Sequence, residues 1–156
     1  MARRTHRTAR PSRSPQARRT AAVPVGCPCG SGAGYAGCCG RLHRGEASAP
    51  TAEALMRSRY AAYAVGDAGH LLRTWDPATR PAVLDLDDGP RWTGLEILDT
   101  TEGSAFHQRG TVTFRASYAE AGRPGVLVER STFRRVDGAW VYVDGTFPED
   151  AGDGGR

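Results

Sequence analysis

The sequence predicts a small α+β fold in which a cysteine-rich segment precedes helices packed on a four-stranded antiparallel sheet. Three observations support it: four cysteines within 13 residues, a helical period over residues 52–65, and alternating β-branched and aromatic residues in the C-terminal half. The 156 residues suit one domain with extensions. No run approaches the roughly 18 apolar residues of a membrane-spanning helix.

Both ends of the chain have the composition of disordered segments. Residues 1–24 mix Arg, Ser, Thr and Pro with almost no large apolar side chain, so we expect a disordered basic tail. Residues 149–156 are expected to form a second flexible tail. The first 20 residues hold seven arginines and no acid, which leaves 14 arginines against 17 carboxylates, a net charge of −3, in residues 21–156. The absence of lysine fits a GC-rich coding genome as well as a selected arginine surface.

The four cysteines lie in residues 25–45 with the spacing C-x-C-x8-C-C. The first residues lack the apolar stretch of a secretory signal, so we expect a cytoplasmic protein, in which thiols stay reduced. Zinc accepts four thiolates at tetrahedral corners, and the glycines between the pairs permit a tight loop. A site with four thiolates keeps no position for water or substrate. We therefore predict one structural Zn²⁺ per chain, bound by Cys27, Cys29, Cys38 and Cys39.

Other interpretations of the cysteines stay open on the sequence alone. A disulfide between the adjacent Cys38 and Cys39 would be strained and unexpected in a reducing cell. A chance cluster is a second alternative, and an iron–sulfur cluster, for which 13 residues are a short wrap, is a third. His43, four residues after Cys39, could also replace one thiolate as a ligand.

Helix signals follow the linker at residues 46–50. Thr51 is a suitable N-cap, and residues 52–65 place one apolar face at helical spacing. Gly66 ends this helix, and residues 67–75 predict a second, short one.

The remaining chain has the period of β-strands. Residues 92–103, 110–122, 125–138 and 139–147 alternate, with Gly-containing turns at Arg123-Pro124-Gly125 and Asp137-Gly138. This half is complete without the cysteines, so we expect the cysteine segment to add its own surface rather than core.

The cysteine block resembles a known zinc motif. Residues 27–40, CPCGSGAGYAGCCG, are similar to the SEC-C motif of the SecA translocation ATPase, in spacing, in the GSG after the second cysteine and in the aromatic Tyr35. The two lysines common after GSG are Ala33 and Gly34 here. In SecA the motif is linked to contacts with a chaperone and the ribosome, so the resemblance implies a protein or ribosome partner.

The resemblance extends to the rest of the chain. LMRSRYAAYAVGD (55–67), LLRTWDP (71–77), WTGLEIL (92–98), VLVERSTF (126–133) and WVYVDGT (140–146) look like the YchJ family of bacterial proteins. That family implies a SEC-C segment, here residues 25–45, followed by a nuclear-transport-factor-2-like (NTF2-like) domain, here residues 50–148, a cone of curved sheet wrapped by helices. Some relatives carry a second SEC-C segment at the C-terminus; PEDAGDGGR (148–156) has none. No activity is established for the family.

Three functions remain in view. The first is a macromolecular interaction module that contacts a protein or the ribosome through the zinc segment. The second is a small-molecule-binding protein, or an isomerase- or dehydratase-type enzyme, in the cone cavity, although a fold does not imply a function. The third is non-specific nucleic-acid contact through the basic tail.

Residues for proton transfer in the cone are carboxylates, histidines and tyrosines. His70, on a short helix, and His107, near a turn, are expected to be solvated, and the carboxylates Glu129 and Asp144 could simply pair with arginines. The candidates are Tyr60, His70, His107, Glu129, Tyr142 and Asp144.

Arg59 breaks the apolar stripe of the first long helix and is expected to face the sheet. A buried charge needs a partner, and alternation places Glu129 and Asp144 on inward faces. We therefore expect a structural ion pair between Arg59 and one of these carboxylates, with snorkelling of the arginine to the rim as the alternative.

Overall fold

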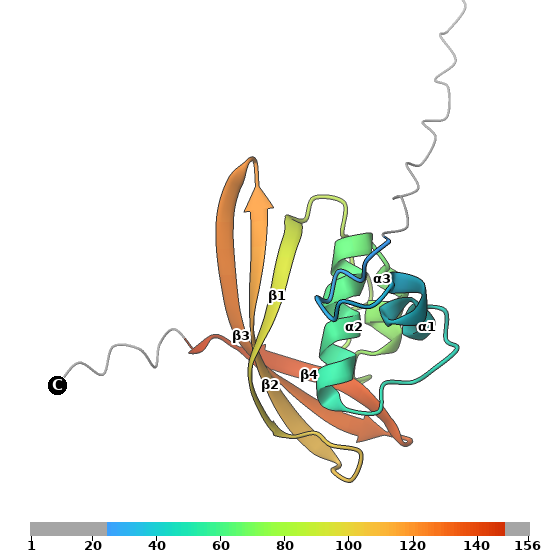
Figure 1. The fold of residues 1–156 in the computed structure, drawn as a ribbon. Helices are drawn as coiled ribbons and strands as arrows, with labels where there is room; N and C mark the ends of the chain where they lie inside the picture. Colours follow the sequence, from blue (N-terminus) through green and yellow to red (C-terminus); the bar gives the residue numbers. More distant parts are fainter. Residues whose placement is uncertain (1–24, 149–156) are drawn as a thin grey trace, which may run out of the picture.

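Residues 25–148 are described in a computed structural model, which has the α+β architecture expected from the sequence (Figure 1). The predictions for the two tails, residues 1–24 and 149–156, lie outside the described residues. The elements in chain order are η1 (Tyr35–Gly37), α1 (Cys39–His43), α2 (Ala52–Val65), α3 (Ala68–Arg73), β1 (Arg91–Glu102), β2 (Arg109–Glu120), β3 (Arg123–Val136) and β4 (Ala139–Thr146).

The two predicted helices form where their capping residues place them. The Thr51 hydroxyl accepts a hydrogen bond of 3.1 Å from the Ala54 N–H at the start of α2. Gly66 ends the helix in the left-handed conformation, with φ of 80°. Asp67 then begins α3 by accepting from the His70 N–H at 3.0 Å.

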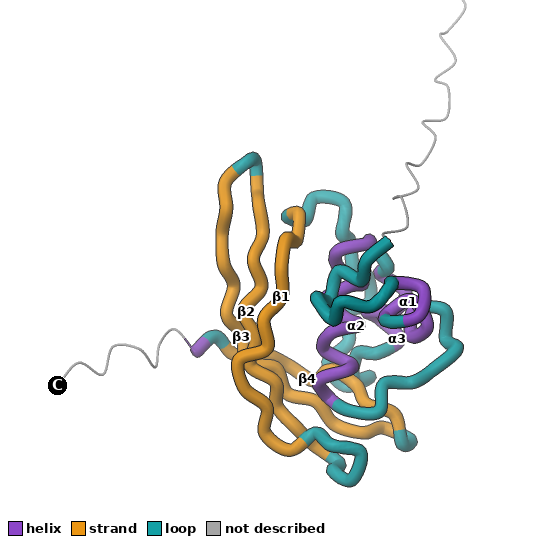
Figure 2. Tube along the Cα trace, viewed as in Figure 1, coloured by secondary structure: helices purple, strands orange, loops and turns teal. Residues whose placement is uncertain are grey.

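The four strands form an antiparallel meander in the order β1-β2-β3-β4. Register shifts interrupt β1 at two places and the β3–β4 pair at one, and the sheet bends around α2 (Figure 2). The β3–β4 turn lies at Asp137-Gly138, as predicted. The predicted turn at Arg123-Pro124-Gly125 is wrong, because these residues belong to β3 and pair with β2. The turn lies at Ala121-Gly122, where both residues have positive φ.

The core lies between α2 and the concave face of the sheet. Leu55, Met56 and Tyr60 of α2 pack on apolar side chains from β2, β3 and β4, among them Val112, Phe114, Phe133 and Trp140.

The chain between α3 and β1 covers the free edge of β4. The Tyr142 N–H donates to the Thr74 carbonyl oxygen at 2.8 Å, and the Asp76 N–H donates to the Tyr142 carbonyl oxygen at 2.7 Å. Arg134 binds the buried Asp76 carboxylate with two guanidinium nitrogens. This strap, residues 74–76, holds Trp75 beside Tyr142 at one end of the cone.

Candidate metal centre and cone cavity

The four cysteine sulfurs converge on one point. All four Sγ atoms lie within 4.8 Å of one another. A tetrahedral site with Zn–S bonds of about 2.3 Å has S–S edges of about 3.8 Å, and the Sγ atoms of Cys29 and Cys38 are 3.7 Å apart. The arrangement is therefore consistent with one metal ion held by four thiolates.

A short backbone framework produces this convergence. The Cys27 N–H donates to the Ala33 carbonyl oxygen at 2.9 Å, and the intervening loop turns through Gly30 and Gly32, with φ of 79° and 84°. Gly40 is required for a different reason. A Cβ at that position would lie 2.6 Å from the Tyr35 carbonyl oxygen.

The thiols shift one another's protonation. Burial raises the pKa of Cys27 and of Cys39, and at Cys39 the charge of neighbouring thiolates raises it further. Burial also acts on Cys29, but hydrogen bonds from Ser31 and Cys27 outweigh it and lower the pKa of Cys29 to about 7. Four thiolates at this separation repel one another strongly, so the fully deprotonated set needs a cation at its centre.

His43 is engaged outside the cysteine cluster. Its Nε2 lies 2.8 Å from the Ser58 carbonyl oxygen, and its Nδ1 lies 2.6 Å from the Tyr35 hydroxyl. Since a carbonyl oxygen only accepts, Nε2 donates to Ser58, and Nδ1 is hydrogen-bonded to the Tyr35 hydroxyl. Both ring nitrogens are thus occupied, and the four cysteines remain the ligand set that the geometry favours.

The cysteine segment is not a separate surface module, contrary to the expectation from sequence. It packs across α2, with α1 on the side of α2 away from the sheet (Figure 1), and Ala61 of α2 packs with Cys27, Cys29 and Cys39. Arg57 donates to the Cys29 carbonyl oxygen at 2.8 Å. The helix α2 is therefore buried on two faces, one by the sheet and one by the cysteine segment.

A buried polar chain joins this segment to α3. The Ser58 hydroxyl donates to the Leu55 carbonyl oxygen and accepts from His70 Nε2 at 2.9 Å. The prediction that His70 is solvated is wrong, because the side chain is only 3% exposed beneath the cysteine segment. Burial, followed by the charge of His43, lowers the pKa of His70 to about 4. His107 is exposed, as expected.

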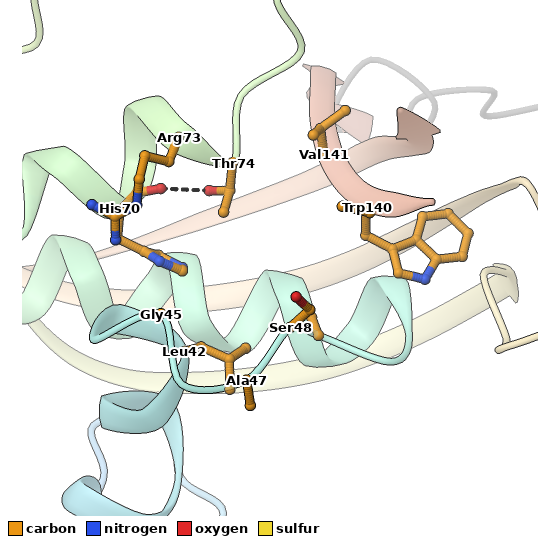
Figure 3. A pocket seen from close by; sticks show the side chains of 11 residues that line it. Leu42, Gly45, Ala47, Ser48, His70, Arg73, Thr74, Trp140 and Val141 are labelled. Carbon is orange, nitrogen blue, oxygen red and sulfur yellow. Dashed lines mark hydrogen bonds between the residues drawn. The ribbon is translucent and has the colours of Figure 1, made fainter. Parts of the chain in front are cut away.

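The same region contains an open hollow of about 190 Å³ (Figure 3). Its wall combines the end of α1 and the loop after it, the helix α3 and the start of β4, including Leu42, His70 and Trp140. A hydrogen bond of 2.7 Å from the Thr74 hydroxyl to the His70 carbonyl oxygen lies along one side. The hollow therefore spans the junction of the cysteine segment and the α+β domain.

Arg59 is buried as predicted, at 3% exposure, but its partners are different. Its Nη1 donates to the Leu71 carbonyl oxygen at 2.7 Å and to the Thr74 hydroxyl at 2.8 Å. The guanidinium carbon lies 4.9 Å from the Trp75 ring centre and 4.6 Å from that of Tyr142. Among the described residues it forms no ion pair with a carboxylate, so the predicted pair with Glu129 or Asp144 is not formed.

Asp144 lies on the opposite face from the one predicted. Thr132 pairs with Asp144 and Phe133 with Tyr142, so Val143 is the extra residue of a β-bulge. One extra residue reverses the alternation, and Asp144 is exposed on the outer face.

Two adjoining hollows, together called the cone cavity here, lie between α2 and the sheet. The smaller, of about 80 Å³, is lined by Arg59, Glu129 and Tyr142. The larger, of about 230 Å³, is lined by Tyr60 and also by Glu129. Of the residues singled out from the sequence, Arg59, Tyr60, Glu129 and Tyr142 line the cone cavity, whereas Asp144 does not.

Several residues of these sites were not among the candidates from the sequence. Ser131 and Trp75 line the smaller hollow, and Ser58 joins the two buried histidines. Ser58 lies outside the apolar stripe of its helix, so no periodicity indicates that it is buried. The role of Trp75 depends on the strap beside β4, which no periodicity indicates.

A SEC-C-type cysteine segment docked on a cone-shaped α+β domain defines the class of the protein. Residues 51–145, more than half of the chain, match the family described as YchJ, middle NTF2-like domain. The chain therefore belongs to the YchJ family, whose curated relatives are called UPF0225 proteins.

The relatives cover most of the chain. A UPF0225 protein of Streptomyces coelicolor is 70% identical over 121 residues, which are 78% of this chain and 94% of the relative. One from Deinococcus radiodurans is 54% identical over 119 residues, 76% of this chain and 86% of the relative.

Two solved structures are similar. The solution structure of a SEC-C motif containing protein from Rhodopseudomonas palustris has 38% identity and a TM-score of 0.69, covering 78% of this chain and 97% of that one. A crystal structure of a SEC-C motif containing protein from Psychrobacter arcticus has a TM-score of 0.64 at 24% identity, over 82% of this chain and 84% of that one. At this level of identity, the Psychrobacter arcticus structure supports the fold alone.

Among the helices of the described residues, none is both long and apolar enough to cross a bilayer.

Proposed function

We propose that the four cysteines bind one Zn²⁺ as a structural ion and that the segment it folds is a contact site for a protein or for the ribosome. The convergence of four thiolates within 4.8 Å carries the first part. Soft thiolate ligands select zinc over magnesium or calcium, and a four-thiolate site has no open position for chemistry.

The exposed side of the segment supports the second part. Its inner side packs on α2, while Val25, at 93% exposure, and Arg41 lie on the surface. Arg41 forms no side-chain hydrogen bond or ion pair with the described residues, so its charge is free for a partner. The zinc would then hold the loops that carry these side chains in a fixed shape, which lowers the entropic cost of binding.

The test compares binding by the intact chain and by variants that keep the metal. Purified ribosomes in a sucrose gradient, and cross-linked lysate proteins identified by mass spectrometry, are the two partner assays. Val25→Ser with Arg41→Glu should reduce the recovered partner at least about tenfold. Arg130→Glu, an equal charge change at an exposed position of β3, should leave recovery unchanged.

Zinc content is measured in every variant. Recovery that is equal for the surface variant and the control, with zinc retained, would contradict an interaction through this segment. Loss of recovery in Cys38→Ser alone would show only that the fold of the segment is needed.

A further inference from the structure

The cone cavity contains a buried cation that the protein does not neutralise directly. Arg59 is 3% exposed and lines the smaller hollow. Within residues 25–148 only Nη1 donates hydrogen bonds, to Leu71 and Thr74, while Nε and Nη2 have no acceptor. Burial lowers the pKa of Arg59 to about 10, so the guanidinium stays charged at neutral pH.

Glu129 supplies the opposite charge on the wall of the same cavity. Its Oε1 accepts from the Tyr142 hydroxyl at 3.1 Å and from the Ser131 hydroxyl at 3.2 Å, both neutral groups. Gly145 leaves the space for this carboxyl, because a Cβ there would overlap Glu129 Oε1. The polar end of the cavity thus carries one positive and one negative group that are not paired with each other.

The rest of the wall is apolar or aromatic. The larger hollow, of about 230 Å³, is lined by Met56, Tyr60, Trp92, Phe114 and Leu127 besides Glu129. Trp92 packs edge-on against Tyr60, with ring centres 6.2 Å apart. A ring or branched alkyl group that entered here would lose water from its apolar surface, as ligands do in most small-molecule sites.

We propose that the cone cavity binds a small molecule without net charge, whose polar head has an acceptor oxygen beside an N–H donor and whose body is an aromatic or branched apolar group. The oxygen accepts from Arg59, and the N–H donates to Glu129. A carboxamide and an amino-acid zwitterion share this head chemistry. An anion would instead lie against Glu129 and a cation against Arg59, and both repulsions are strong away from water.

Four probes with one body test the charge preference on the full metal-loaded chain. They are phenylacetamide, phenylalanine, phenylacetate and phenethylamine, measured by isothermal titration and by protein NMR shifts at the indole N–H groups of Trp75 and Trp92. The amide or the amino acid should bind at least about tenfold tighter than the anion and the cation. The ratio of the affinities for phenylacetamide and phenylalanine identifies which of the two polar heads the cavity prefers. Absence of binding by all four up to about 10 mM, or tightest binding of a charged probe, would overturn the proposal.

Variants test the two charged groups separately. Glu129→Gln should raise the affinity for phenylacetate relative to phenylacetamide about tenfold, because the repelling charge is removed. Asp144→Asn is the matched control, since it removes the same charge from the outer face of the sheet and should leave the ratio unchanged. Arg59→Met should abolish binding of the amide if the variant is folded by circular dichroism. An unchanged ratio in Glu129→Gln would overturn the assignment without any need for Arg59→Met to fold.

Discussion

His43 donates a hydrogen bond of 2.8 Å from Nε2 to the backbone carbonyl oxygen of Ser58, in the middle of α2. The histidine follows the last cysteine by four residues, and the serine also accepts from His70 of α3. These two buried contacts therefore tie the cysteine segment to both helices of the α+β domain. They make the cysteine segment part of the domain's core.

His43→Ala should lower the free energy of unfolding by about 2 kcal/mol, because the Tyr35 hydroxyl and the Ser58 carbonyl oxygen lose their hydrogen-bond partner and a buried cavity remains. Urea unfolding with zinc present measures the loss. Arg41→Ala, on the same short helix but exposed, should change it by less than about 0.5 kcal/mol. Equal effects of the two substitutions would contradict a core role for His43.

A chain that begins at Ala49 should be less stable than the full chain. Its α2 would expose Ser58 and Ala61, both at 0% exposure in the intact protein, and His70 would gain access to water. We expect a lower urea midpoint and a weaker dependence of stability on pH between 6.5 and 4, because a solvated His70 has a pKa closer to that in the unfolded chain. An unchanged midpoint would instead support the separate module expected from the sequence.

Acid should destabilise the protein through His70. The unfolded chain takes up a proton there near the ordinary pKa of 6.5, whereas the folded protein does so only near pH 4. The unfolded state therefore binds more protons within this window, and stability falls as the pH decreases from 6.5 to 4, by on the order of 3 kcal/mol.

The variant His70→Gln isolates this contribution from the protonation of the cysteines. Its loss of stability between pH 6.5 and 4 should be smaller than that of the intact chain. His107→Gln, which changes an exposed histidine, should follow the intact chain. Parallel pH curves for all three would contradict the burial of a neutral His70.

Energetic coupling around Glu129 should follow the direct contacts. Tyr142→Phe and Glu129→Gln remove two sides of one hydrogen bond and should couple by about 1 kcal/mol in a double-mutant cycle. Arg59→Met and Glu129→Gln should couple more weakly, because their side chains form no ion pair. A coupling of about 3 kcal/mol between Arg59 and Glu129 would restore the buried pair expected from the sequence.

Local chemistry explains what the sequence predicted well. Thr51 and Gly66 fixed the ends of α2 because their side-chain and backbone preferences act within one turn of helix. Asp137-Gly138 fixed a hairpin for the same reason. The cysteine spacing predicted the cluster because ligand distances restrict the loop between them.

Non-local features were missed. The bulge at Val143 moved Asp144 outward, although simple alternation had placed it inward with Trp140 and Tyr142. The partner of Arg59 is the backbone carbonyl of Leu71, and every residue carries such a carbonyl, so composition gives no sign of it. His70 is buried by a segment about 30 residues earlier in the chain, and only tertiary packing brings the two together.

X-ray absorption at the zinc edge, with the metal content of the purified chain, measures directly whether the four cysteines hold a structural zinc. We expect one zinc per chain and a single shell of four sulfurs at about 2.3 Å, without a nitrogen or oxygen ligand. A shell of three sulfurs and one imidazole nitrogen would show that a histidine takes the place of one cysteine as a ligand. A fully folded chain with four titratable thiols and no metal would contradict a structural zinc altogether.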